Sequence, residues 1–407
     1  MEAVAELDLP VLDYMDPSLS GPRLHDTLRA LAEQTWVARA EPLGWFVLDR
    51  EATAFFLRTS SATFPGRKLL EVHGVTAGPL YERLKSNLLD LRGEAHKRLR
   101  KLLQPAFTPK AADAYREAMR DQLSQLWRQV ASEGRCEFVE SFAKPYPARM
   151  IATFMGAPLA DSGRLHEWAN LIQGQFDPVK LATRLPELER AAAEFQDYVR
   201  GLLDERKGAP ADDLVSTLLR LEEEGDRLTE DECLDIASSL LVGGVDTTQS
   251  QLAHGIRLFA EHPAQWRLLG EQPALVPAAV EEVLRFEPIA PFTARIVLEE
   301  IEYRGVLFAE GTLIFCCGHT ANRDPDAYEE PELFDIASER GREKPLSFGA
   351  GPHFCLGANL ARAELQEALS FLAPRMRDLA LDGDPVYDTP LGVYGMRELR
   401  VRFRAGP

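Results

Sequence analysis

The stretch 348–365, FGAGPHFCLGANLARAEL, is the feature that most constrains this chain. Gly349 and Gly351 permit backbone turns that other residues avoid, and a helical pattern of small residues follows Cys355. A cysteine at a helix start meets unpaired N–H groups and the positive end of the helix dipole, which favour its thiolate. A lone cysteine beside a glycine-rich turn is more often a buried structural residue. The crowding of special residues here instead predicts a sulfur positioned as a ligand, with room beside it for a flat group.

Composition and charge exclude several classes of protein. The 407 residues carry a formal net charge of -18, which disfavours nucleic-acid binding through bulk electrostatics. The N-terminal MEAVAELDLP is acidic and lacks an apolar leader. The longest apolar stretch, 236–245, is far shorter than the ~20 residues of a membrane span. We therefore expect a soluble, cytoplasmic protein with no nucleic-acid or membrane partner.

The cysteines restrict the covalent and metal chemistry. The chain has 5 cysteines, an odd number, and no C-x-x-C pair. This pattern disfavours a disulfide scaffold or a four-cysteine zinc site, and it lacks the C-x-x-C-H motif of covalently attached heme.

The distribution of periodic segments predicts a mainly α fold with a small β portion. Residues 36–40 and 45–48 flank a turn and predict a hairpin, and residues 110–286 have the pattern of successive amphipathic helices. Short β-branched and aromatic runs occupy 295–317, and a helix is expected from Cys355 to about residue 376. No linker divides the chain, so we expect a single domain over 1–407.

A long helical segment, IASSLLVGGVDTTQSQLAHG at 236–255, contains two adjacent glycines. Each costs about 1 kcal/mol relative to alanine inside a helix. One interpretation ends the helix at Gly243 and lets Asp246 cap a second helix, with Gln249 completing a capping box. The other keeps a single helix that is distorted at the glycines. The residues alone leave both interpretations of this segment open.

The cysteine stretch resembles the signature of the cytochrome P450 superfamily of heme-thiolate monooxygenases, F-G-x-G-x-H-x-C-x-G. The match is complete over 348–357. The resemblance implies the cytochrome P450 fold, with a long central helix over a heme b. It makes Cys355 the axial iron ligand and His353 a contact of a heme propionate. A thiolate ligand pushes electron density onto the iron and favours O–O cleavage.

The glycine-containing helix is similar to the oxygen-binding helix of that family. The resemblance implies that Gly243 and Gly244 open a groove for O2 beside the iron. Splitting O2 requires protons, and a hydroxyl can hold water while a carboxylate relays protons from solvent. The resemblance assigns the first role to Thr247 and the second to Asp246.

Glu282 and Arg285 have the E-x-x-R spacing of the same family. An acid and a base three residues apart on a helix are usually a surface pair worth about 0.2–0.5 kcal/mol. The resemblance instead implies a buried structural network that holds the segment before the cysteine stretch. The usual third member is an arginine, for which Arg340 lies at the right distance from Phe348.

Three further residues match heme-propionate contacts. His96 and Arg100 are one helical turn apart and share a face, which by itself indicates only a basic, solvated surface. The resemblance assigns these two residues and Arg295 to the propionates. Buried carboxylates need such cationic partners.

The sequence contains no G-x-G-x-x-G motif and no added flavin or iron–sulfur segment. We therefore expect electrons from a separate ferredoxin and ferredoxin reductase. A basic cluster that includes Lys97 and Arg98 could attract an acidic ferredoxin, although a generic basic helix face explains it equally well.

The resemblance places apolar residues around the substrate, which predicts an uncharged, hydrophobic small molecule. These residues are Val242, Val245, Ile289, Phe292 and Val393. The expected reaction inserts one oxygen atom of O2 into a C–H or C=C bond. Alternatives on the same heme are aryl coupling, dehydrogenation and peroxide-driven oxidation. More distant alternatives are a heme-binding sensor without turnover and a zinc protein using His353, Cys355, Cys316 and His319.

Overall fold

The computed structural model describes residues 2–72, 74–84, 87–223, 228–338 and 343–406. The chain divides into two compact units, each assembled from segments far apart in sequence. The first unit contains Met1–Pro65, Ala278–Cys355 and Tyr387–Gly395. The second unit contains Gly66–Pro277, Leu356–Val386 and Met396–Pro407.

The first unit is built on a six-stranded sheet with the order β2-β3-β4-β10-β7-β5. The strands are β2 (Val11–Asp13), β3 (Val37–Glu41), β4 (Trp45–Val47), β10 (Leu313–Cys317), β7 (Phe292–Val297) and β5 (Ala62–Thr63). Strands β3 and β4 pair antiparallel, which confirms the predicted hairpin. Strand β10 pairs parallel with β4 and antiparallel with β7, so the predicted 295–317 strands join the N-terminal hairpin.

A second small sheet and four helices complete the first unit. The sheet has the order β1-β9-β8, and the helices include most of α15. Their bounds are β1 (Glu2–Ala3), β9 (Val306–Phe308), β8 (Ile301–Tyr303), α1 (Gly21–Ala32), α2 (Arg50–Arg58), α15 (Val276–Phe286) and α16 (Gly318–Ala321). The Asp49 carboxylate caps α2 by accepting from the backbone N–H of Ala52. Buried apolar residues from both sheets and α2 form one core of this unit.

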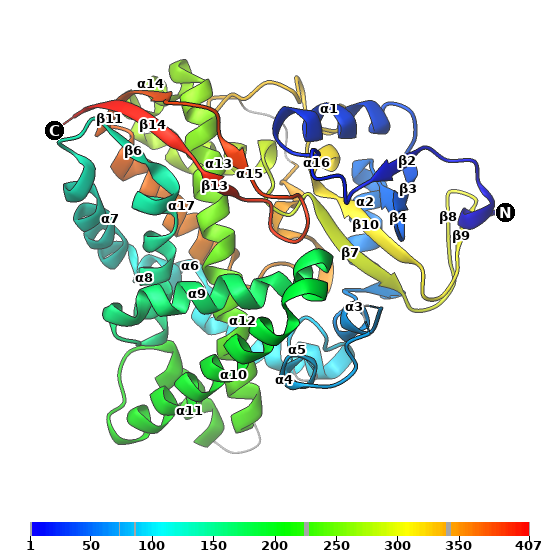
Figure 1. Cartoon of the computed structure of the whole chain (residues 1–407), viewed down its shortest axis with the longest axis horizontal. Helices are drawn as coiled ribbons and strands as arrows, with labels where there is room; N and C mark the ends of the chain where they lie inside the picture. Colours follow the sequence, from blue (N-terminus) through cyan, green and yellow to red (C-terminus); the bar gives the residue numbers. More distant parts are fainter. Residues whose placement is uncertain (1, 73, 85–86, 224–227, 339–342, 407) are drawn as a thin grey trace. The chain divides into compact units, whose positions relative to one another are not determined.

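The second unit is mostly helical (Figure 1). Its helices are α3 (Arg67–Val72), α4 (Pro79–Arg83), α5 (Gly93–Leu103), α6 (Pro109–Asp113), α7 (Arg116–Val130), α8 (Pro145–Met155), α9 (Ser162–Gln173), α10 (Pro178–Gly208), α11 (Leu214–Glu223), α12 (Glu230–Gly244), α13 (Asp246–Glu261), α14 (Pro263–Glu271) and α17 (Ala358–Leu372). Strands β11 (Met376–Leu381), β14 (Arg400–Ala405) and β6 (Arg135–Glu137) form a three-stranded sheet, and β12 (Val386–Tyr387) pairs with β13 (Met396–Glu398). Helix α17 ends four residues before the expected residue 376, because β11 begins there.

Helices α12 and α13 follow one another as one long column in Figure 1. A capping box at Thr229 starts α12: its hydroxyl accepts from the N–H of Glu232, whose carboxylate accepts from the N–H of Thr229. Val245 alone separates the two helices, and its dihedral angles of -90° and -68° remain close to helical. Asp246 is the first residue of α13 rather than its cap. The interpretation of a single helix distorted at the glycines is therefore the one that the structure adopts.

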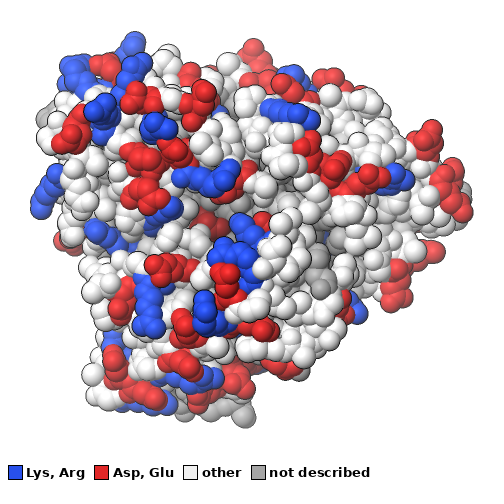
Figure 2. All heavy atoms as spheres, viewed as in Figure 1, with Lys and Arg blue, Asp and Glu red and all other residues white. Residues whose placement is uncertain are grey.

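Figure 2 shows the charged side chains on one face of the molecule. Acidic and basic side chains are interspersed there. Among the described residues, no helix is both long enough and apolar enough to cross a membrane.

Candidate active site

The loop of residues 348–355 in the first unit, called the cysteine loop below, contains two glycines with left-handed backbone angles. Gly349 has φ 71° and Gly351 has φ 70°, values that favour glycine. A Cβ on Gly351 would lie 2.8 Å from the carbonyl oxygen of Leu57, at the end of α2. Gly351 therefore also permits the loop to pack against α2. The backbone N–H of Cys355 donates to the carbonyl of Phe348 at 2.9 Å, which closes the loop three residues before α17 begins.

Cys355 differs from the other four cysteines in its exposure. It is exposed, whereas Cys136 is half-buried and Cys233, Cys316 and Cys317 are buried. Burial raises the pKa of the Cys136 and Cys316 thiols to about 12, and it also raises the pKa of Cys317. Those thiols stay protonated and are poor ligands. The loop thus presents the one cysteine that is exposed among the described residues.

Arg295 on β7 is a buried cation that suits an anionic ligand. It is 3% exposed, and burial lowers the pKa of its guanidinium. Its guanidinium donates to the carbonyl of Ala294 at 2.8 Å, and no ion pair with a carboxylate of the described residues accompanies that bond. A buried guanidinium without such a partner fits a heme propionate. In the same unit, Nε2 of the half-buried His353 lies 3.4 Å from Oγ1 of Thr63.

His96 and Arg100 lie on α5 of the second unit. His96 is buried and Arg100 is half-buried. Burial, and then the charge of Arg100, lower the pKa of His96. A neutral imidazole next to a cation on one helix face can donate one hydrogen bond to a carboxylate while the guanidinium supplies the charge.

The two glycines of α12 have different surroundings. A Cβ on Gly244 would lie 3.0 Å from Cδ1 of Ile151, so this glycine allows α8 to pack closely. No atom lies within 4 Å of a Cβ built on Gly243, which is exposed. The hydroxyl of Thr247 donates to the carbonyl of Gly243 at 2.5 Å. Gly243 and Thr247 therefore share the open face of the helix.

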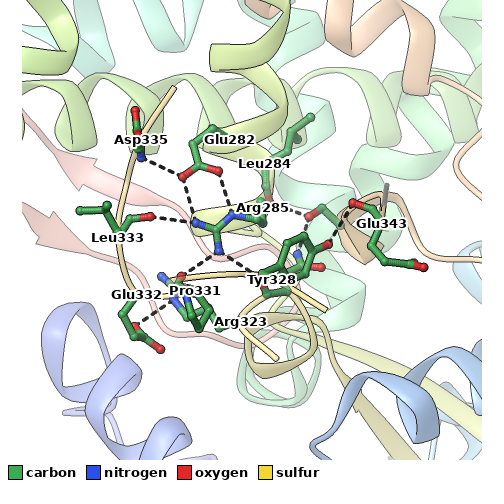
Figure 3. Close-up of polar contacts among 12 residues, drawn as sticks. Glu282, Leu284, Arg285, Arg323, Tyr328, Pro331, Glu332, Leu333, Asp335 and Glu343 are labelled. Atoms are coloured by element: carbon green, nitrogen blue, oxygen red, sulfur yellow. Dashed lines mark hydrogen bonds and ion pairs between the residues drawn. The ribbon is translucent and has the colours of Figure 1, made fainter. Parts of the chain in front are cut away.

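Glu282 and Arg285 on α15 form a buried ion pair, 7% and 3% exposed, with two hydrogen bonds of 2.8 and 2.9 Å (Figure 3). Arg285 also donates to the carbonyls of Asn322, Pro331 and Leu333 at 3.1, 2.8 and 3.0 Å. Glu282 and Arg285 therefore belong to a buried hydrogen-bonded network and do not form a surface ion pair. The predicted third member, Arg340, lies outside the described residues.

Asn322 and Ser347 connect this network to the cysteine loop. The Asn322 amide donates to the Ser347 hydroxyl at 2.9 Å, and its oxygen accepts from the N–H of Leu346 at 2.7 Å. The Ser347 hydroxyl donates to the carbonyl of Leu284 at 2.5 Å. The sequence could not show these contacts, because they join segments 25 and 63 positions apart.

The residues expected around the substrate lie in different surroundings. Ile289, Phe292 and Val393 of the first unit are half-buried, and the carbonyl of Ile289 accepts from the N–H of Tyr394 at 2.7 Å. Val242 and Val245 of the second unit are 6% and 0% exposed and belong to its main apolar core. The less buried positions of α12 include Ser239 and Gly243.

Within the described residues, one group of side chains is close enough to hold a metal ion: His25, Glu287 and His319. Nδ1 of His25 lies 2.6 Å from Nε2 of His319, whereas two nitrogens sharing a zinc ion at about 2.0–2.1 Å lie roughly 3.3 Å apart. Arg323 also donates to Nε2 of His319 at 3.0 Å. The cluster is therefore a hydrogen-bonded chain, and His319 lies in it rather than beside Cys355.

The buried His319 predicts a loss of stability in acid. Burial, and then the charge of Arg323, hold the pKa of His319 well below its ordinary value. The unfolded chain binds a proton at His319 that the folded protein does not, so the free energy of unfolding falls as pH drops below about 6.5, by up to about 1.4 kcal/mol per pH unit. We expect His319→Gln to flatten this fall, measured as urea midpoints between about pH 7.5 and about pH 5.5. An unchanged slope in the variant would contradict the prediction.

A family model described as Cytochrome P450 matches residues 72–373. The chain belongs to the cytochrome P450 family. The fold and the heme b cofactor predicted from the cysteine stretch are thereby confirmed, and the protein is a heme-thiolate monooxygenase.

Known relatives cover nearly the whole chain of this cytochrome P450. It is 37% identical to luteothin monooxygenase of Streptomyces thioluteus, over 98% of this chain and 97% of the relative. It is 33% identical to the biotin biosynthesis cytochrome P450 of Bacillus subtilis, over 93% and 95%. The crystal structure of P450BioI with a fatty-acid-ligated acyl carrier protein has 32% identity and a TM-score of 0.84, over 93% of this chain and 97% of that one. The structure of CalO2 has 27% identity and a TM-score of 0.90, over 98% and 100%.

Proposed function

We propose that this cytochrome P450 hydroxylates or epoxidises an uncharged, largely hydrophobic small molecule, with the whole chain, 1–407, acting as one catalytic domain. O2 supplies the oxygen atom, and a separate ferredoxin and ferredoxin reductase supply the electrons. The observation that carries the proposal is the closed loop that presents the exposed residue Cys355. A relative named mycinamicin IV hydroxylase/epoxidase, 36% identical over 74% of this chain, supports the reaction type.

The proposal assigns a role to the cysteine and to the four residues that match heme-propionate contacts. Cys355 binds the iron, and His353, Arg295, His96 and Arg100 hold the propionates. When bound, the heme supplies thiolate-assisted activation of O2. The cations offset the cost of burying two carboxylates, and so fix the orientation of the ring.

Thr247 and Asp246 act on protons in this proposal. The Thr247 hydroxyl uses its single hydrogen on the carbonyl of Gly243, so its oxygen lone pairs are left to accept from a water molecule. That water is held on the open helix face beside Gly243. Asp246, adjacent to Thr247 at the start of α13, is partly exposed and can exchange protons with solvent.

We expect Thr247→Ala to uncouple electron use from product formation. Without the hydroxyl, the water that carries the proton is no longer held, and reducing equivalents are lost as peroxide. Product formed per electron should fall by about tenfold or more, given the roughly 10²–10⁴-fold worth of positioned proton transfer. Peroxide and product are measured against NADPH consumed. Thr247→Ser, which keeps the hydroxyl, should restore most of the coupling, and unchanged coupling in the alanine variant would refute the role.

The surface expected to bind ferredoxin, around Lys97 and Arg98, is less positively charged than the sequence suggests. Lys97 pairs with Glu94 at 2.8 Å, and Arg98 pairs with Glu232. Reversing both charges, with Lys97→Glu and Arg98→Glu, should still slow reduction by ferredoxin, by roughly tenfold at low ionic strength, and the difference should shrink with added salt. Lys207→Glu is the matched control, because Lys207 also pairs with an acid three residues away. Equal rates in the wild type and the double variant would remove this surface from the proposal.

The function is tested with purified holoenzyme, ferredoxin, its reductase and NADPH. Candidate substrates are first selected by spectral titration, in which a ligand that displaces iron-bound water shifts the main absorption band. Substrate-dependent oxygen uptake, with label from isotopic O2 in the product, would support the proposal. Coupling or dehydrogenation would consume O2 without labelling the product. Turnover with peroxide but not with ferredoxin would indicate peroxide-driven oxidation, and the absence of any turnover would indicate a sensor.

A further inference from the structure

Two buried side chains tie the segment before α5 to the rest of the second unit. Arg83, 4% exposed, donates to the side-chain oxygen of Gln175 at 2.9 Å. Asn87, 3% exposed, donates from its amide to the hydroxyl of Ser239 on α12 at 2.9 Å. The segment around Asn87 is therefore attached directly to the helix that carries Gly243 and Thr247.

Ser239 lies on the open face of α12. Residues four apart share a helix face, so Ser239, Gly243 and Thr247 form one row. Ser239 is half-buried, whereas its neighbour Ser238 is 0% exposed. At 1.5 Å per residue, Ser239 is about 12 Å from Thr247 along the helix. Asn87 and Ser239 thus lie two turns from the residues proposed to act on O2.

The hydrogen bonds of this pair leave a lone pair of Ser239 and an amide N–H of Asn87 unused. The Ser239 hydroxyl donates to the carbonyl of Asp235 at 2.7 Å and accepts from Asn87, so one lone pair remains. The Asn87 oxygen accepts from the N–H of Leu89 at 2.9 Å, which fixes the orientation of the amide because a backbone N–H can only donate. The second N–H of the Asn87 amide remains. The adjacent lone pair and N–H match a group that both donates and accepts.

We propose that Asn87 and Ser239 form a specificity subsite for a hydroxyl group of the substrate, located about 12 Å from the carbon that is oxidised near Thr247. This inference rests on the proposed function, because it assumes that Thr247 lies on the oxygen side of the heme. The substrate is then an elongated, mainly apolar molecule with a hydroxyl at one end and the oxidised carbon toward the other. The hydroxyl donates to the Ser239 oxygen and accepts from the Asn87 amide.

The test uses N-(ω-hydroxyalkyl)imidazoles of graded chain length as probes on the holoenzyme. The imidazole nitrogen ligates the heme iron and shifts the absorption band, so each Kd is read directly. N-Alkylimidazoles and the corresponding methyl ethers are the reference probes. At one chain length we expect the hydroxyl probe to bind about fivefold more tightly than either reference, as one net hydrogen bond would give. Ser239→Ala should abolish this advantage, and Ser238→Ala, which alters the buried neighbour, should keep it.

Three results would overturn the inference. These are an advantage that persists in Ser239→Ala, an advantage with no dependence on chain length, and an equal loss for hydroxyl and alkyl probes in Ser239→Ala. The last result would make the Asn87–Ser239 bond a structural clamp only. If no imidazole shifted the absorption band of the wild type, the proposed heme site itself would fail, and the subsite would fall with it.

Discussion

We expect Cys355→Ser to abolish monooxygenase turnover and the red-shifted absorbance of the reduced, carbon-monoxide-treated protein. A serine hydroxyl has no accessible anion at neutral pH, so it cannot replace the thiolate as the electron-donating ligand. The loss should far exceed the roughly 10–100-fold cost of removing an outer-shell partner of a metal. The loop itself should survive, because the bond that closes it uses the backbone N–H of residue 355.

Cys136→Ser is the matched control for this variant. Cys136 is half-buried, and burial raises the pKa of its thiol to about 12, so it offers no thiolate. The control should keep both turnover and the red-shifted absorbance. The assignment of the iron ligand would be wrong if Cys355→Ser kept either the turnover or the red-shifted absorbance. It would also be wrong if the Cys136→Ser control lost both properties.

The sequence was sufficient for the local part of the site. The spacing from Phe348 to Cys355 encodes the turn, since the glycines supply the left-handed angles and the hydrogen bond joins residues within the motif. It did not reveal why Gly351 must lack a side chain, because the close contact is with Leu57 of α2. Contacts between distant segments depend on tertiary packing, and a local pattern cannot contain them.

Val242 on α12 and Val245 just after that helix illustrate a second limit of the sequence analysis. The family resemblance placed Val242 and Val245 among the substrate contacts, and in the structure both belong to the main apolar core of the second unit. Helical phase would have pointed to Ser239, four residues before Gly243 on the same face. We therefore propose that Ser239 and Gly243 also lie on the substrate side.

The Glu282–Arg285 pair shows how burial changes the meaning of one sequence spacing. Its spacing is indistinguishable from that of Asp26 and Arg29, which are 68% and 51% exposed. The difference arises because the carbonyls of Asn322, Pro331 and Leu333, all distant in sequence, surround Arg285. Sequence alone therefore supplied the pair, and the family resemblance supplied its burial.

We expect Arg285→Ala to cost about 3–5 kcal/mol of unfolding free energy, a large part of the roughly 5–15 kcal/mol that stabilises a typical protein. The variant leaves the Glu282 carboxylate buried without its partner and three carbonyls without a donor. Because Asn322 and Ser347 connect this network to the cysteine loop, heme retention should fall with stability. Urea midpoints and the heme content of the purified protein measure the two effects.

Two further variants separate burial from spacing. Arg29→Ala removes an exposed arginine with the same spacing to an acid, and it should change the urea midpoint little. The double variant Glu282→Gln with Arg285→Met removes both charges, and it should be less destabilised than Arg285→Ala, because no unpaired charge remains buried. If Arg285→Ala were as stable as Arg29→Ala, the network would not support the fold. If the double variant were the less stable of the two, the cost would come from the lost hydrogen bonds to the carbonyls rather than from the charge of Glu282.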